Sequence, residues 1–461
     1  MPHQSTSSQK WLCAHREQFA EAVLFLFILS PIFQLLYCFL HSGDAVFSGD
    51  LFYTTLVQIT TACAFVIGIF AFAAAYLDNR PGNIKVFFKN VPARLPFLFL
   101  CLWMVLVTCI NGFTDAALTG DSYRGESLFS FVTYFALYFL CGTLIKSESV
   151  KHRLIYGFLI VNTIVNLVTL FDYFISPLAI FKMNETFSSI FYQFNHYGYF
   201  LLFGTILSAT LLVVQSNWKQ NIFPVVTLVL NTLLLSINNT FGCFLSCIVT
   251  LTLLVAAESI RRKRFNTKAL GVWVAFLLIS FTIGARFSTY TDDCVGFLKD
   301  IGAVFGVSDS THTDEEAKNL AANAGTGRWT LWTHTAGYIA EKPLFGWGVE
   351  GINSRLEAET NGVNSRPHNE YLQYAAFFGI PGALLYLAGL VLVAWRALKR
   401  FRSLDNATFI CLVATFAYLF SAMFGNTMFY TAPFLFIFMG LSCSFTSTSA
   451  TETTTENNTN E

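Results

Sequence analysis

The chain has 461 residues, of which 54% are hydrophobic and 12% are charged. Soluble domains carry about 25% charged residues, so this composition excludes a soluble globular enzyme and a disordered chain. Lysine plus arginine and aspartate plus glutamate balance at 28 each, and this balance excludes the basic surface that nucleic-acid binding requires. We therefore expect a polytopic membrane protein.

Hydrophobic runs near the length that a bilayer needs, about 20 residues, recur along the chain. Because lipid offers backbone N–H and C=O groups no partner, each run is expected to be a helix. The sequence thus predicts an all-α protein with about 12 transmembrane helices. In chain order the predicted spans are 19–40, 51–76, 96–112, 128–145, 154–174, 197–215, 222–237, 241–257, 269–285, 380–395, 408–425 and 427–443.

The distribution of charge predicts the orientation of these spans. Cytoplasmic loops of membrane proteins are enriched in lysine and arginine. With the N-terminus inside, most basic residues fall on the cytoplasmic side, and Asp44, Asp50 and Asp115 fall outside. Both termini are therefore expected in the cytoplasm, and the first span is expected to act as a signal anchor.

One connection is much longer than the others, and it defines the expected domain organisation. A loop of this length in a compact protein is usually functional, so we expect the chemistry there, in an extracytoplasmic, largely helical loop. The expected parts are a cytoplasmic tail at 1–18, spans at 19–285, the large outer loop at 286–368, three spans at 369–443 and a disordered cytoplasmic tail at 444–461.

The outer loop contains a predicted amphipathic helix that begins near Arg328, with Thr326 as its N-cap. Its expected apolar face is formed by residues at helical spacing, Trp329, Trp332, Ala336 and Ile339. The first turn of a helix favours anions, and an arginine there can hold a diphosphate through paired hydrogen bonds. The alternative is an arginine on lipid headgroups, with the tryptophans anchoring the helix in the membrane.

A second feature lies at the end of the loop, around His368. Pro367 suits the first position of a helix, which places His368 in the first turn. A helix N-terminus disfavours imidazolium and keeps the ring neutral, the state that a general base needs. Asn369 and Glu370 are candidates to orient the ring or contact a polar ligand. The alternative is a histidine at the membrane interface without a catalytic role.

Together, a cation and a candidate base at the outer membrane surface suit a lipid-linked phosphate substrate. With these motifs the chain resembles the O-antigen ligase and polymerase (Wzy-like) superfamily of polytopic membrane glycosyltransferases. The motifs that carry the resemblance are Arg328-Trp-Thr-Leu-Trp332, Pro343-Leu-Phe-Gly-Trp-Gly348, His368-Asn-Glu-Tyr-Leu372 and Gly379-Ile-Pro-Gly382, with Asn195-His-Tyr-Gly198 upstream.

The resemblance implies a metal-independent, inverting glycosyltransferase that needs no cofactor. The implied donor is a glycan on undecaprenyl diphosphate, and the acceptor is a hydroxyl of a glycan, lipid or protein at the outer face of the cytoplasmic membrane. By the same carry-over, His368 is the base or positions the acceptor, and Arg328 binds the diphosphate and stabilises the leaving group. Trp332 is a further candidate contact to the substrate.

The chain departs from the family pattern at one element. Many members carry Ser-Arg-Gly at the outer start of a middle span, where the arginine is a second diphosphate ligand. The corresponding stretch here is Ser236-Ile-Asn-Asn-Thr-Phe-Gly242, without arginine. The candidates to replace this arginine are Asn238, Asn239 and Thr240 by hydrogen bonding, or Arg286 and Arg366 by charge.

Two other functions compete with the enzyme. A transporter or flippase of lipid-linked glycans would line its core with buried charges, and Asp172, near the outer end of the fifth span, is the carboxylate closest to such a position. A membrane scaffold or sensor would leave the pairing of Arg328 with His368 unexplained.

Overall fold

A computed structural model describes most of the chain. The residues described are 7–40, 88, 91, 93–120, 126–175, 187–191, 193–284, 289–296, 328–360, 366–427 and 429–444. Within these residues every regular element is a helix, so the predicted all-α class is confirmed. Seven helices in this part of the chain are long and apolar enough to cross a membrane, and shorter apolar helices accompany them.

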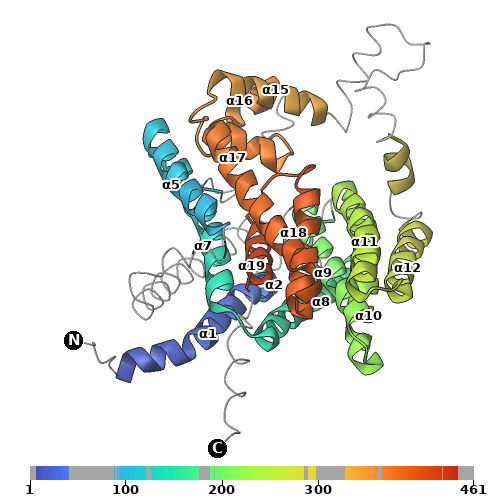
Figure 1. The fold of residues 1–461 in the computed structure, drawn as a ribbon. Coiled ribbons are helices and arrows are strands. Elements are labelled where there is room, and N and C mark those ends of the chain that lie inside the picture. Colours follow the sequence, from blue (N-terminus) through green and yellow to red (C-terminus); the bar gives the residue numbers. More distant parts are fainter. Residues whose placement is uncertain are drawn as a thin grey trace, which may run out of the picture.

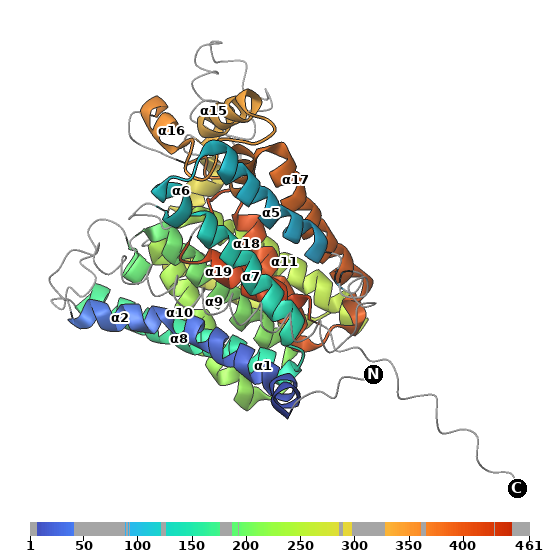
Figure 2. The ribbon, with the colours of Figure 1, turned by 90° about the vertical axis from the view of Figure 1, so that its left-hand side faces the viewer.

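The elements follow one another as a bundle of helices, with a small helical layer over one end (Figures 1 and 2). They are α1 (Ser7–Ile28), α2 (Ser30–Leu40), α5 (Arg94–Asn111), α6 (Asp115–Thr119), α7 (Leu128–Leu144), α8 (Glu148–Ile175), η2 (Ser189–Phe191), α9 (Phe194–Val214), α10 (Trp218–Asn238), α11 (Phe241–Arg262), α12 (Thr267–Gly284), α15 (Arg328–Glu341), α16 (Asn353–Glu359), α17 (Glu370–Lys399), η3 (Phe401–Ser403), α18 (Asn406–Ser421) and α19 (Ala432–Ser442). In both views α15 and α16 lie together beyond one end of the bundle.

The predicted spans overlap the observed apolar helices, apart from the span at 51–76, which lies outside the described residues. Three of the predicted spans differ in their bounds from the observed helices. The predicted span 380–395 is the second part of α17, which begins at Glu370. The predicted spans 408–425 and 427–443 are the shorter helices α18 and α19, joined by a non-helical segment that we call the α18–α19 connection (residues 422–431).

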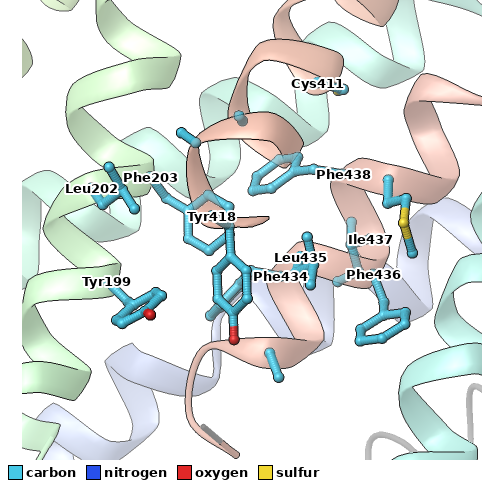
Figure 3. Packing of buried hydrophobic residues seen from close by; sticks show 14 of the residues in the cluster. Tyr199, Leu202, Phe203, Cys411, Tyr418, Phe434, Leu435, Phe436, Ile437 and Phe438 are labelled. Atoms are coloured by element: carbon cyan, nitrogen blue, oxygen red, sulfur yellow. The ribbon is translucent and has the colours of Figure 1, made fainter. Parts of the chain in front are cut away.

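The centre of the bundle is α9, whose residues from Tyr197 to Val214 are all buried. A helix that is apolar on every side belongs in the interior of a protein. Its Phe203 ring lies 5.6 Å from the Tyr418 ring of α18 and 5.3 Å from the Phe438 ring of α19, centroid to centroid (Figure 3). Aromatic packing therefore joins α9 to the two helices that flank the α18–α19 connection.

Hydrogen bonds between buried asparagines join α8, α9 and α10. Asn231 Nδ2 donates to Asn162 Oδ1 over 2.8 Å, and Asn166 Nδ2 donates to Asn231 Oδ1 over 3.0 Å. The Tyr197 hydroxyl of α9 donates to Asn166 Oδ1 over 2.9 Å. In an apolar environment such bonds hold helices together, and they specify which faces of these three helices meet.

Basic side chains gather at one end of the bundle and bind the last carbonyls of several helices. Arg262 donates to Val213 O and Val214 O at the end of α9, Arg94 donates to Gly142 O of α7, and Lys151 donates to Ser444 O after α19. Helix C-termini carry partial negative charge, which these cations neutralise. The same charges that predict the orientation thus also cap the helices.

This basic end and the small helical layer are at opposite ends of the molecule. Lys151 pairs with Asp405, just beyond the C-terminal end of α17. At Gly379 the first part of α17 bends back towards the second, because Glu370 accepts from the Tyr386 hydroxyl and the Tyr374 ring stacks on the Tyr386 ring at 4.1 Å. A helix rises 1.5 Å per residue, so the part of α17 from Tyr386 to Lys399 spans about 20 Å, which separates Glu370 from the basic residues.

Candidate active site

The turn Pro343–Gly348 joins the small helical layer, formed by α15 and α16, to a kink in α17. Pro381 has no N–H, and Gly379 has non-helical backbone angles, so the kink leaves carbonyls without their helical donors. Trp347 N donates to Ala376 O and Gly348 N donates to Phe377 O, each over 2.9 Å. The turn therefore completes the hydrogen bonding of the kinked helix.

Glycine is required on both sides of this contact. Gly379 has φ +72° and Gly346 has φ +63°, angles that other residues rarely adopt. A Cβ on Gly346 would lie 2.6 Å from both Gly379 N and Phe377 O. The two glycines thus permit the close approach of two backbones, which explains in physical terms why the Gly-x-Gly turn and the Gly-x-Pro segment occur together.

Ion pairs join α15 to the short helix α16, which the sequence analysis did not predict. Arg355 of α16 pairs with Glu341 of α15 over 2.6 Å. Glu359 pairs with His334 Nδ1 over 2.8 Å and accepts a hydrogen bond from the Tyr338 hydroxyl. These contacts hold α15 in a fixed orientation over the bundle.

The predicted helix is confirmed as α15. Its buried residues are Leu331, Thr335 and Tyr338. Of the expected apolar face, Trp332 and Ile339 are partly buried and pack against the core, whereas Trp329 is 38% exposed. The predicted N-cap, Thr326, lies outside the described residues.

Arg328 is the first residue of α15, as predicted, and lies close to Tyr199 near the start of α9. Burial lowers the pKa of the Arg328 guanidinium, and the electrostatic interaction with the Tyr199 hydroxyl opposes that shift. The same hydroxyl lies against Gly425, where an added Cβ would overlap it. Tyr199 therefore lies between the α18–α19 connection, which it contacts, and the charge of Arg328, which it interacts with electrostatically.

His368 meets the same connection from another direction. Its backbone N–H donates to Asn426 Oδ1 over 2.7 Å, and its φ of +49° places it in the left-handed region. The prediction that His368 lies in the first helical turn was wrong, because Asn369 is the N-cap of α17 and its side chain accepts from Leu372 N. The helix begins at Glu370, three residues later than the Pro367 rule suggests.

Tyr199 and His368 thus lie against consecutive residues, Gly425 and Asn426, and Arg328 interacts electrostatically with that tyrosine. The sequence analysis missed Asn426 and Tyr199. Asn426 was read as the break between two adjacent spans. The signal that could have identified the connection is Gly425-Asn426-Thr427, since glycine and asparagine favour turns over helix.

Two further predicted residues have other partners in the bundle. Arg366 is 5% exposed and pairs with the carboxylates of Glu126 and Glu350. Glu370 is fully buried, accepts from the Tyr386 hydroxyl over 2.7 Å and donates its N–H to Ala422 O. We therefore do not count Arg366 or Glu370 among the proposed substrate ligands.

The stretch expected to replace the family arginine builds a turn. Asn238 Nδ2 donates to Phe187 O and Phe194 O over 2.8 and 2.9 Å, and Thr240 donates to Asn238 Oδ1. Asn239 donates to the hydroxyl of Thr289. The donors of these side chains are engaged within the protein.

This turn packs against the upstream motif that opens α9, since a Cβ on Gly198 would lie 2.6 Å from Thr240 Oγ1. In the same motif, the ring of His196 lies 4.9 Å from the ring of Tyr430 in the α18–α19 connection. Arg286 lies outside the described residues. Asp172 is 5% exposed, on α8.

Comparison with known proteins agrees with this architecture. Residues 198–387 match the model of the O-antigen ligase family. This part of the chain is similar to the O-antigen ligase family. The match includes Arg328, His368 and the kink at Gly379, and it ends before Asn426. No curated protein matches the chain. The similarity, together with the apolar helices, supports a membrane protein of glycan transfer.

Proposed function

We propose that this O-antigen ligase-like protein is a membrane glycosyltransferase that transfers or polymerises a glycan from undecaprenyl diphosphate onto an acceptor hydroxyl. The observation that carries the proposal is that His368 bonds Asn426 while Tyr199, which interacts electrostatically with Arg328, lies against the adjacent Gly425. One group suits a diphosphate and the other suits a hydroxyl. The proposed setting is the outer face of the cytoplasmic membrane, where cell-surface polysaccharides are assembled.

In the proposed reaction, the acceptor oxygen attacks the anomeric carbon from the face opposite the diphosphate. The new glycosidic C–O bond forms as the bond to the diphosphate oxygen breaks, so the anomeric configuration inverts. His368 accepts the proton of the acceptor hydroxyl. The electron pair of the broken bond stays on the diphosphate, and the Arg328 guanidinium stabilises that charge.

Two neighbours support Arg328 in this role. The start of α15 contributes backbone N–H groups that favour an anion at the same position. Trp332 lies one helical turn from Arg328, and we propose that its indole contacts the carrier lipid or the first sugar. Trp329, which is 38% exposed, would then lie at the level of the lipid headgroups, where indoles are enriched.

The distribution of charge supports the outer face. Basic residues cluster at the end of the bundle where Lys151 and Asp405 meet, whereas Glu370, two residues after His368, bonds Tyr386 about 20 Å along α17 from that end. Because basic loops stay in the cytoplasm, the end that carries Arg328 and His368 would face outward.

The test is glycan transfer by the purified protein in proteoliposomes. The donor is undecaprenyl-diphosphate glycan extracted from source cells that lack this protein, and the acceptor is a membrane extract of the same cells. We expect His368→Ala to lower the rate about 10²- to 10⁴-fold and Arg328→Ala about 10²- to 10³-fold. The matched controls are His152→Ala and Arg264→Ala, at the basic end of the bundle, which keep the wild-type rate.

Two results would contradict the proposal. Full transfer by His368→Ala would remove the histidine from the reaction. Movement of the labelled lipid-linked glycan across the membrane without transfer to any acceptor would instead favour the flippase.

A further inference from the structure

We propose that Arg366 is a positioning residue that holds His368 in place from within a buried polar chain, here called the Arg366 clamp (Glu350, Arg366, Glu126 and Gln373). The inference rests on the proposed function, because it assigns the clamp to the histidine of that reaction. In this proposal Arg366 positions His368 and does not bind the donor.

The clamp joins three separate parts of the chain. Arg366 lies just before α17 and pairs with Glu350, in the loop between α15 and α16. Its other ion pair is with Glu126, which precedes α7. The side chains of Arg366 and Glu126 are 6% and 1% exposed, and that of Glu350 is 10% exposed. The outer layer is thereby tied to the bundle at a point two residues from His368.

The clamp continues to the segment that binds the histidine. Gln373 Nε2 donates to Glu126 Oε2 over 3.3 Å, and Gln373 Oε1 accepts from Thr427 N over 3.1 Å. Thr427 adjoins Asn426, whose Oδ1 accepts the N–H of His368. The clamp therefore closes a ring, from Arg366 through Glu126 and Gln373 to residues 426–427 and back to His368.

The ring accounts for the unusual backbone conformation of His368. His368 has φ +49°, and a residue other than glycine keeps such a conformation only where its surroundings over-determine it. Peptide bonds fix its distance from Arg366, and the hydrogen bond to Asn426 fixes its other side. The clamp holds both attachment points at once, so it determines where the imidazole lies relative to Arg328.

The charges of the clamp provide a test that distinguishes a positioning arginine from an arginine that binds the donor. Removal of Arg366 alone leaves two buried carboxylates without their shared cation, which is strongly destabilising. Replacement of a whole buried ion cluster by neutral side chains is often tolerated. A residue that binds diphosphate behaves differently, because neutralising its neighbours does not restore the lost positive charge.

The experiment compares Arg366→Met, the neutral triple variant R366M/E126Q/E350Q and Gln373→Ala. Thr250→Val, on α11, is the matched control, because its buried hydroxyl has no hydrogen-bond partner within the described residues and lies outside the clamp. We measure kcat and KM for the extracted donor, thermal shift with free undecaprenyl diphosphate, and amide hydrogen exchange of the peptides that carry His368 and Thr427. These two amides are themselves donors in the ring.

We expect Arg366→Met to lower kcat about 10²-fold, the loss that a misplacement of about 1 Å can cause, with unchanged KM and faster exchange at His368 and Thr427. The triple variant recovers most of kcat and of the protection. Gln373→Ala lowers kcat and speeds exchange at Thr427 while the ion pairs stay intact, so it tests the clamp even if Arg366→Met does not fold. Thr250→Val resembles the wild type.

The proposal is overturned if the triple variant stays as inactive as Arg366→Met and both lose the thermal shift with undecaprenyl diphosphate. It is also overturned if Gln373→Ala matches the wild type in kcat and exchange. The exchange measurement needs no catalysis. A wild-type protein that transfers no glycan would therefore refute the proposed function, while the exchange data would still decide whether the clamp exists.

Discussion

The backbone N–H of His368 donates a 2.7 Å hydrogen bond to Oδ1 of Asn426. The two residues are 58 positions apart, and α17 and α18 lie between them in the sequence. The bond ties the candidate base to the non-helical segment that also lies against Tyr199, the residue that interacts electrostatically with Arg328. The α18–α19 connection is therefore the element around which the proposed site is built.

Asn426→Ala should lower the rate of glycan transfer about 10- to 100-fold with little effect on donor binding. The substitution leaves the His368 N–H without its acceptor in a mostly buried place, and an unmade hydrogen bond of this kind costs about 1–3 kcal/mol. Steady-state kinetics in proteoliposomes measure the effect. Met423→Ala, on the same connection but 44% exposed, is the control. A wild-type kcat in Asn426→Ala would show that this bond does not position the histidine.

Gly379→Ala should destabilise the protein by about 1–3 kcal/mol, the cost of a backbone conformation that is essentially restricted to glycine. The backbone angles at Gly379 are φ 72° and ψ 175°, and the new Cβ would also lie 2.5 Å from the carbonyl carbon of Leu344. The melting temperature in detergent reports the loss. Gly337→Ala is the control within α15, because its Cβ meets no described atom within 4 Å, and alanine should stabilise that helix by about 0.5–1 kcal/mol. Equal melting temperatures for the two variants would refute the prediction.

Gly204→Ala should disrupt the asparagine network at the centre of the bundle. A Cβ there would lie 2.6 Å from Asn162 Oδ1 and would press against Asn231, so at least one of the hydrogen bonds between helices must break. Each such bond in a membrane protein contributes about 0.6 to 1.7 kcal/mol. Unfolding in mixed detergent micelles measures the difference. Gly271→Ala, on α12, has open space around its Cβ within the described structure and should leave the unfolding free energy unchanged or slightly raised.

The contact between α15 and α16 should weaken in acid. The hydrogen bond from Tyr338, with the nearby charges of His334 and Arg355, lowers the pKa of the Glu359 carboxyl below its ordinary value of 4.5. A carboxyl whose pKa is lower in the folded state stabilises the fold above its ordinary pKa, and this stabilisation is lost as the pH falls through the folded value. The wild-type melting temperature should therefore fall below about pH 4.5. Glu359→Gln should have a lower melting temperature near neutral pH and a smaller fall in acid. An identical pH profile for the two proteins would refute this prediction.

Much of the fold follows from hydrophobicity alone. A run such as 241–257 can satisfy its backbone in lipid only as a helix, and α11 begins where the sequence predicts. The α18–α19 connection could not be predicted in this way, because Met423, Phe424, Phe429 and Tyr430 are as apolar as a span. Their backbone bends where Gly425 and Asn426 favour a turn and where neighbouring helices supply partners, which depends on tertiary structure.

In the candidate site too, some features follow from the local sequence and others depend on tertiary structure. A motif predicts Arg328 at the start of a helix, since helix signals are local. The face of α15 that turns inward, and the pairing of Arg366 with two carboxylates, depend on residues far away in the sequence. The sequence could indicate that Arg366 is a cation near the site, but Glu126, which neutralises it, lies 240 positions upstream.

The kink at Gly379 has a consequence for how the protein is made. During synthesis α17 follows Pro343–Gly348 out of the ribosome, and the carbonyls of Ala376 and Phe377 reach the bilayer without donors of their own. Lipid cannot supply these donors, so the backbone of α17 is fully hydrogen-bonded in a membrane only once the preceding turn has folded back onto it. The turn is accordingly part of the assembly of α17, and a fragment that begins after Gly348 would leave this helix poorly inserted.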